Sequence, residues 1–229
     1  MKIIFLILYG HDDRVTYHDR FIYQELQRLS QIYFKKMSET FDFKYFFISY
    51  NNDIDKNIVE QDDCIFIKGN EEFNKIYEKT QLAMKYVHTV YNADYIVRTN
   101  ISSFWNIPNL FSIIDRIPRE KCFAGVKVFD FISGTGLIFS RDACEYFIHQ
   151  PICYGPDDVN ISYAMSKYCH HSYLDESYMY YMTDDRITIP NNTDSILYYR
   201  IKNGNRLNDI LCFKTLLSHI YLILEDIQR

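Results

Sequence analysis

The feature that most constrains the fold is the alternation of short β-rich runs with amphipathic stretches through the first half of the chain. The β-rich runs are residues 3–9, 44–49, 64–68 and 95–99, and the amphipathic stretches are residues 17–36 and 71–90. Alternation of this kind is typical of strands joined by crossover helices. It predicts an α/β fold with a mixed, mostly parallel central sheet flanked by helices.

The second half of the chain continues with shorter elements. Strands are expected at residues 122–128 and 136–140, and helices near residues 106–114, from Asp142, over residues 157–168 and in a C-terminal segment of about residues 205–229. With 229 residues, of which 48% are apolar, the chain can bury one large core. We therefore expect a single domain over residues 1–229.

Net charge and composition limit the kinds of partner that the protein is expected to bind. The formal net charge of −5 argues against binding to nucleic acid or to an anionic membrane. The apolar run at residues 3–9 is too short to span a bilayer, which takes about 20 residues, and it predicts a first strand. The 6 cysteines are scattered without metal-site spacing, as expected for reduced thiols. The sequence thus predicts a cytoplasmic protein without a membrane span.

Three segments carry most of the functional information. They are residues 63–99, which include Lys79-Thr80, then Ser133-Gly134-Thr135-Gly136, and then Gly155-Pro156-Asp157-Asp158-Val159. In this order and spacing they resemble the β-1,3-galactosyltransferase and Fringe-like family of inverting glycosyltransferases, over about residues 60–168. Each motif alone is a weak signal, and their ordered co-occurrence carries the resemblance.

The resemblance implies a GT-A (Rossmann-like) domain that transfers a sugar from a nucleotide-diphosphate sugar to a glycan or glycoconjugate acceptor. It implies a hexosyltransferase-like enzyme, with a UDP-sugar as the expected donor. Members of the family are typically anchored in the Golgi membrane. Because this chain shows no anchor, we expect a cytoplasmic form of viral or microbial origin.

Two carboxylates stand where an inverting transfer needs a base. The acceptor hydroxyl must lose its proton as its oxygen attacks the anomeric carbon opposite the leaving nucleotide diphosphate. By resemblance, Asp158 is the expected base and Asp157 its neighbour. Both residues open an expected helix, so the alternative is that they only cap it.

The segment Ser133-Gly134-Thr135-Gly136 is expected to form a wall of the sugar pocket. Small residues let the backbone approach a ligand closely, and hydroxyl and amide groups can bind sugar hydroxyls. The alternative is a glycine-containing turn that only introduces a buried strand.

The family's acidic metal motif is replaced here by Arg98-Thr99-Asn100, with Asn100 and Ser102 at the carboxylate positions. Neutral amide and hydroxyl oxygens are poor ligands for a hard divalent cation. We therefore expect no metal cofactor, and Mn²⁺ or Mg²⁺ is the alternative. Cationic side chains would then offset the charge of the diphosphate.

The cations expected to bind the donor come from three parts of the chain. They are Lys79 at the border of a helix face, Arg98, and the cluster Arg200, Lys202 and Arg206 before the last helix. In GT-A enzymes a C-terminal element commonly closes over the donor, which is where this cluster would lie. A solvated basic turn is the alternative for the cluster.

Two further segments contain residues that could contact a ligand. Gly10, His11 and Asp13 directly follow the first strand, at the edge where open α/β sheets bind ligands, so contacts with the nucleotide base or ribose are expected from them. The alternative, which is the more common role for each residue taken alone, is a loop or capping residue. Asp53 and Asp55 form a literal Asp-x-Asp motif, but they lie in an Asn/Asp-rich stretch that predicts a solvated loop.

Two rival functions remain on the sequence alone. The first is a catalytically inactive GT-A protein that binds a carbohydrate or nucleotide. The second is a nucleotidyltransferase, which would need a carboxylate pair for Mg²⁺ and a glycine-rich phosphate loop; no convincing loop of that kind occurs in the sequence.

Overall fold

Four parallel strands form the centre of a mixed sheet in the computed structural model, which describes residues 1–229 except 11–16, 184–186, 191–192, 194 and 228–229. They are β1 (Ile3–Leu8), β2 (Phe43–Tyr50), β4 (Cys64–Ile67) and β5 (Tyr95–Asn100). Five consecutive residues of β1 are buried. A continuous apolar run of this kind is typical of a strand that is covered on both faces.

Around this centre the strand order is β10-β7-β9-β5-β1-β2-β4-β3, with β8 paired to β7. The outer strands are β3 (Ile58–Gln61), β7 (Cys122–Val128), β8 (Phe131–Ile132), β9 (Gly136–Ser140) and β10 (His170–Leu174). Strand β9 runs antiparallel to both of its neighbours, β5 and β7. The mixed α/β fold expected from the sequence is therefore confirmed.

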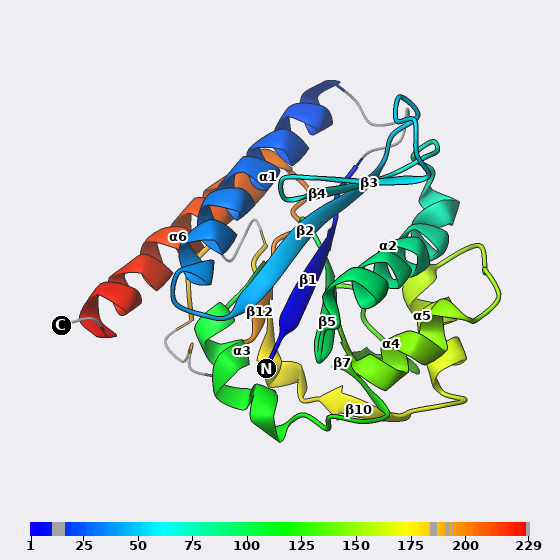
Figure 1. The fold of residues 1–229 in the computed structure, drawn as a ribbon. Coiled ribbons are helices and arrows are strands. Elements are labelled where there is room, and N and C mark those ends of the chain that lie inside the picture. Colours follow the sequence, from blue (N-terminus) through cyan, green and yellow to red (C-terminus); the bar gives the residue numbers. More distant parts are fainter. Residues whose placement is uncertain (11–16, 184–186, 191–192, 194, 228–229) are drawn as a thin grey trace.

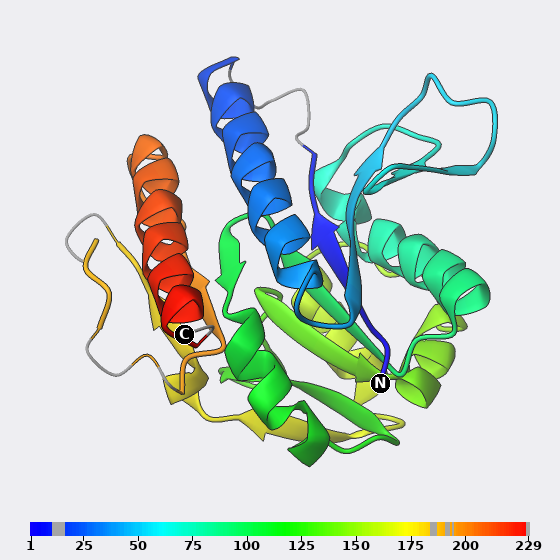
Figure 2. The ribbon, with the colours of Figure 1, turned by 60° about the vertical axis from the view of Figure 1, so that its left-hand side comes forward.

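Helices cover both faces of this sheet (Figures 1 and 2). One face carries α1 (Tyr17–Ser38), α3 (Ile107–Ile113) and α6 (Leu207–Ile227), and the other carries α2 (Ile76–Tyr91), α4 (Arg141–Ile148) and α5 (Asp157–Met165). Strand residues alternate between two apolar clusters, one beneath each helix layer. Helix α2 begins later than expected, because a short 3-10 turn, Phe73–Lys75, precedes it.

A second, three-stranded sheet was not expected from the sequence. It consists of β6 (Ser103–Trp105), β11 (Met179–Tyr181) and β12 (Tyr198–Arg200), and β12 runs antiparallel to β6 with Arg200 opposite Ser103. The buried Trp105 stacks on Tyr198 across this pair. The pairing brings a C-terminal segment beside the residues that follow β5.

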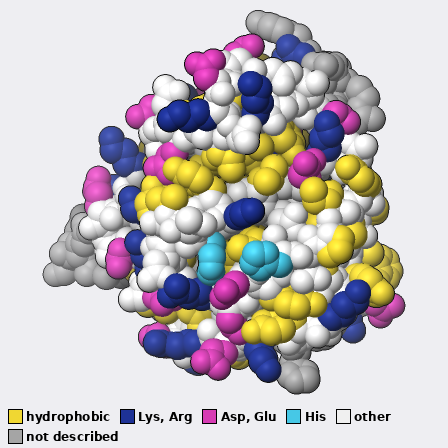
Figure 3. All heavy atoms as spheres, turned by 45° about the vertical axis from the view of Figure 1, so that its right-hand side comes forward, with side chains coloured by type: hydrophobic (Ala, Val, Ile, Leu, Met, Phe, Trp, Pro, Cys, Tyr) yellow, Lys and Arg dark blue, Asp and Glu magenta, His cyan; other side chains and the backbone are white. Residues whose placement is uncertain are grey.

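The surface carries charges of both signs. On the described part of the face seen in Figure 3, basic and acidic side chains are interspersed. That face does not present the continuous basic stripe that follows a nucleic-acid backbone. Within the described residues, no helix combines the length and the apolar character needed to cross a membrane.

Candidate active site

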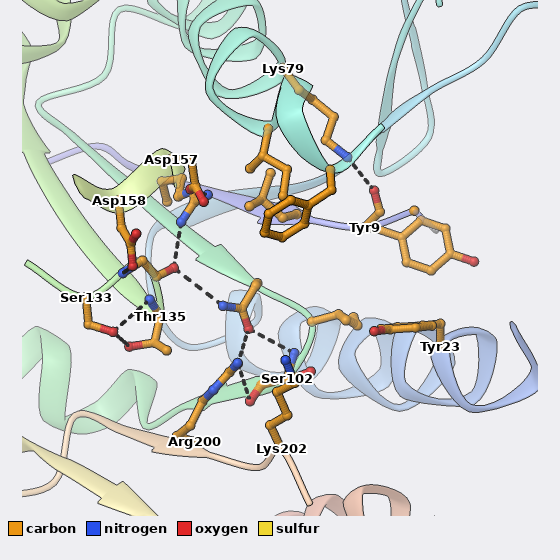
Figure 4. Close-up of a pocket in the computed structure, with 18 of the residues that line it drawn as sticks. Tyr9, Tyr23, Lys79, Ser102, Ser133, Thr135, Asp157, Asp158, Arg200 and Lys202 are labelled. Atoms are coloured by element: carbon orange, nitrogen blue, oxygen red, sulfur yellow. Dashed lines mark hydrogen bonds and ion pairs between the residues drawn. The ribbon is translucent and has the colours of Figure 1, made fainter. Parts of the chain in front are cut away.

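A pocket of about 580 Å³ opens at the carboxyl edge of β1 and β5. Ligands of open α/β sheets bind at this edge, because the loops there converge while the strands hold them rigidly. Figure 4 shows Asp158, Ser133 and Thr135 on one side of the pocket and Tyr9 and Tyr23 on the opposite side. Arg200 and Lys202 lie on a third side, between these two groups (Figure 4).

Asp158 lies in the first turn of α5 at the pocket wall. Its Oδ2 accepts a hydrogen bond from the backbone N–H of Gly134 at 3.2 Å, and its Oδ1 accepts one from the N–H of Val159 at 3.0 Å. A carboxylate has about four acceptor positions. Asp158 therefore has acceptor capacity left for a hydroxyl group in the pocket.

Gly134, in the Ser-Gly-Thr-Gly segment, packs against both Arg98 and the candidate base Asp158. A Cβ atom on Gly134 would lie 2.8 Å from Arg98 Nη1 and 3.1 Å from Asp158 Cβ. Ser133 and Thr135 flank it, with their hydroxyl oxygens 2.9 Å apart. The close approach that the sequence suggested for this segment is thus made to protein side chains.

Gly134→Ala is expected to lower the free energy of unfolding by about 1–3 kcal/mol, because the added methyl group would lie only 2.8 Å from Arg98 Nη1. Chemical denaturation measures this loss. The matched control is Gly204→Ala at an exposed position without a positive φ, which should change stability by less than about 0.5 kcal/mol. Equal stability of the two variants would show that Arg98 and Asp158 move aside freely.

Two of the expected donor-binding cations are already paired with carboxylates. Arg98 donates through Nη2 to Asp157 Oδ2 and through Nη1 to the Gly134 carbonyl, the latter at 2.6 Å. Lys79 Nζ donates to both oxygens of Glu71, at 2.9 and 2.8 Å. Burial lowers the pKa of Lys79, and Glu71 opposes that shift. Neither cation brings an unbalanced charge to the pocket.

Glu71 also fixes the backbone at the pocket edge. It accepts a hydrogen bond from the N–H of Tyr50 at 2.7 Å, and Lys79 donates to the carbonyl of Tyr9 at 3.1 Å. Gly10 has a φ of 116° and a Cβ there would lie 2.2 Å from Glu71 Oε1. Only glycine satisfies both conditions. The Lys79–Glu71 pair therefore ties together the ends of β1, β2 and the start of α2.

Asn100 does not offer a vacant metal ligand. Its Oδ1 accepts from Arg200 Nη1 at 2.7 Å, from the N–H of Ser102 at 3.1 Å and from the Ser103 hydroxyl at 3.1 Å. No group of three or more His, Cys, Asp or Glu side chains within the described residues could hold a metal ion. The residues present around Asn100 do not fit a divalent cation.

Arg200 and Lys202 are the cations that face the pocket without a carboxylate partner among the described residues. Burial lowers the pKa of Arg200, and the neighbouring charge of Arg206 lowers it further. The same two causes, burial and then nearby arginines, lower the pKa of Lys202. A cluster of like charges that depresses its own pKa values is stabilised when an anion binds.

Several of the expected site residues lie behind the pocket wall. Thr99 accepts from Trp105 Nε1 at 2.8 Å and donates to the Thr135 carbonyl at 2.7 Å, and a Cβ on Gly136 would meet Trp105 at 2.8 Å. Arg206 pairs with the buried Asp209 at 2.7 Å and reaches Ser102 Oγ at 3.3 Å. These residues support the wall. His11 and Asp13 fall outside the described residues.

Tyr9 and Tyr23 are among the pocket residues that the sequence did not predict for the site. Tyr9 and Tyr23 line the end opposite Asp158, and the guanidinium of Arg206 lies 5.4 Å from the centre of the Tyr23 ring. The available signal for Tyr9 was its position at the end of the predicted first strand, directly before Gly10. Nothing in the sequence singles out Tyr23 within its helix.

The strand order and the pocket at the carboxyl edge define an α/β protein with a Rossmann-like domain. Among solved structures, the chain is similar to a glycosyltransferase involved in the glycosylation of the major capsid of PBCV-1, with a TM-score of 0.57 and 10% sequence identity. The similarity covers 94% of this chain and 100% of that one, which confirms the fold. No protein-family model matches the sequence, and a search of curated proteins finds no match.

Proposed function

We propose that this protein is an inverting glycosyltransferase that uses a nucleotide-diphosphate sugar. The observation that carries the proposal is one pocket with a partly exposed carboxylate, Asp158, on one side and, on another, two cations, Arg200 and Lys202, that have no carboxylate partner among the described residues. A carboxylate suits the removal of a proton from an acceptor, and adjacent cations suit a diphosphate leaving group. The solved glycosyltransferase of the same fold supports this choice of reaction.

The proposed donor lies along the pocket from the tyrosines to the Ser-Gly-Thr-Gly wall. The nucleotide base stacks at Tyr9 and Tyr23, because aromatic rings offer a flat apolar surface to a base. The diphosphate lies at Arg200 and Lys202, and the sugar lies toward Ser133, whose hydroxyl can bond to a sugar hydroxyl. UDP is the expected nucleotide and a hexose the expected sugar.

In the proposed reaction Asp158 takes the proton of the acceptor hydroxyl. The acceptor oxygen forms a bond to the anomeric carbon while the bond from that carbon to the diphosphate oxygen breaks on the opposite face. The nucleotide diphosphate leaves with the bonding electron pair. Arg200 and Lys202 stabilise its developing negative charge.

The transfer is expected to need no divalent metal, because Arg200 and Lys202 replace the missing carboxylate site. The test incubates the protein with a panel of nucleotide sugars and a glycan acceptor, with and without a chelator, and follows nucleotide release. Release with a UDP-sugar should stay within about twofold when the chelator is present. Loss of release with the chelator would show that a metal is used after all.

A second candidate function is a catalytically inactive GT-A protein that binds a carbohydrate or nucleotide. The observation that favours it is that both carboxylate oxygens of Asp158 already accept backbone N–H groups, from Gly134 and Val159, as those of a purely structural carboxylate would. Binding of a nucleotide sugar without turnover of any acceptor would support this candidate. No binding of any donor would exclude both functions.

The remaining features of the proposal follow from the chain's expected setting. The acceptor is a glycan or a glycoconjugate, and the protein acts in the cytoplasm of a virus-infected or microbial cell. Fractionation of the cell that expresses it, followed by the same release assay on each fraction, tests this location.

A further inference from the structure

Arg98 occupies a strand position that should be apolar. In the sheet it lies in register between Leu6 of β1 and Leu137 of β9, and both leucines belong to the apolar cluster beneath α2, α4 and α5. The side chain of Arg98 is 2% exposed. Side chains on neighbouring strands in register point to the same face. The arginine therefore starts within a hydrophobic layer and reaches outward to the pocket wall.

A contribution to stability alone does not explain a buried guanidinium at this position. An apolar side chain would fit the layer, whereas a buried charge needs a partner and full hydrogen bonding. Arg98 Nε is buried and finds no hydrogen-bond partner among the described residues. The pairing of Arg98 is thus incomplete, which points to a role other than filling the core.

The two bonds that Arg98 does make converge on the carboxylate side of the pocket. One Nη group binds Asp157 in the first turn of α5, and the other binds the carbonyl of Gly134, whose N–H in turn donates to Asp158. Arg98 therefore contacts both backbone elements that hold Asp158, namely the start of α5 and the Ser-Gly-Thr-Gly segment. Its own nitrogen atoms have little access to a ligand.

We propose that Arg98 is a positioning residue, which fixes the proposed base Asp158 through Asp157 and Gly134 and does not bind the donor. The inference rests on the proposed function for its kinetic consequences. Lys79 on α2 also interacts electrostatically with both Arg98 and Asp157. A misplacement of a reacting group by about 1 Å lowers a rate by about 10²-fold.

The test compares Arg98→Lys, Asp157→Asn and the double variant in steady-state kinetics. Each single variant is expected to lower kcat by about 10–100-fold while the KM for the donor stays within about threefold. The double variant should be no worse than the poorer single variant, because both changes break one connection. A donor-binding role for Arg98 would raise the donor KM, and independent roles would multiply the two losses; either result overturns the proposal.

Amide hydrogen exchange provides a readout that needs no activity. In Arg98→Lys the first-turn amides of α5, at Val159, Asn160 and Ile161, should exchange at least about tenfold faster, while the amides of α4 should not change. If the wild-type protein transfers no sugar, the proposed function fails and exchange still decides the role of Arg98. Unchanged exchange at α5 contradicts that role.

If Arg98→Lys does not fold, a second variant can test the proposal. Asp157 is partly exposed, with a side chain 16% accessible, and Asn retains its shape and one acceptor oxygen. Asp157→Asn therefore tests the same connection from the solvent side if Arg98→Lys cannot be prepared. It should show the same kcat loss, constant donor KM and faster exchange at the start of α5, and its failure to do so overturns the proposal.

Discussion

Replacement of Asp158 by Asn is expected to lower kcat by about 10³-fold, because general-base catalysis by a positioned side chain contributes about 10²–10⁴-fold. The amide oxygen of Asn can still accept the N–H of Gly134, which lies 3.2 Å from Asp158 Oδ2, so the start of α5 keeps its anchor. The affinity for the donor should remain within about twofold, since Asp158 acts on the acceptor. Nucleotide release and calorimetric donor binding measure the two quantities.

The matched control for this variant is Asp55→Asn in the exposed loop between β2 and β3. Asp53 and Asp55 form the literal Asp-x-Asp motif, and their exposed positions agree with the solvated loop that the sequence predicts. The control should leave kcat unchanged. A loss confined to Asp55→Asn would move the catalytic site away from the pocket, and a loss below about tenfold in Asp158→Asn would remove Asp158 as the base.

The second large effect is expected for Arg200→Met, which should weaken donor binding by about 10–100-fold. A hydrogen bond to a charged group contributes about 1.5–3 kcal/mol, and a factor of ten corresponds to about 1.4 kcal/mol. Methionine retains much of the apolar stem, so packing around β12 is preserved. Asn100 Oδ1 keeps its bonds from Ser102 and Ser103. Calorimetry with the donor and with the free nucleotide diphosphate measures the loss.

A surface arginine away from the pocket is the control. Arg119→Met removes a side chain that is 76% exposed and should leave donor affinity unchanged. Lys202→Met, at a more exposed pocket position than Arg200, should weaken binding by a smaller factor. Equal donor affinity in wild type and Arg200→Met would show that the diphosphate does not lie at this cluster.

The sequence predicted the fold better than it predicted the role of each residue in the site. Strands at residues 122–128 and 136–140 were predicted at their observed bounds, because periodic apolar runs and flanking turns are local signals. Strands β6, β11 and β12 have three residues each and carry no such signal. Their pairing depends on tertiary context.

The pairing of charged residues depends on tertiary structure in the same way. Arg98, Lys79, Arg200 and Lys202 were all expected to bind the donor, and all four line the pocket. What a sequence cannot show is which cation has a carboxylate beside it. Arg98 meets Asp157 across 59 positions of the chain. Pairing with a carboxylate distinguishes Arg98 and Lys79 from Arg200 and Lys202. The latter two remain open to a ligand.

The β6–β12 pairing has a consequence for synthesis of the protein on the ribosome. Arg200 reaches Asn100 across 100 positions of the chain, through a strand of three residues. The central parallel strands are complete once β5 has emerged, at residue 100, whereas the basic side of the pocket forms only after β12 has emerged. A nascent chain therefore carries the proposed base and its supports before it can carry the proposed diphosphate site. Donor binding therefore becomes possible only after β12 has been synthesised.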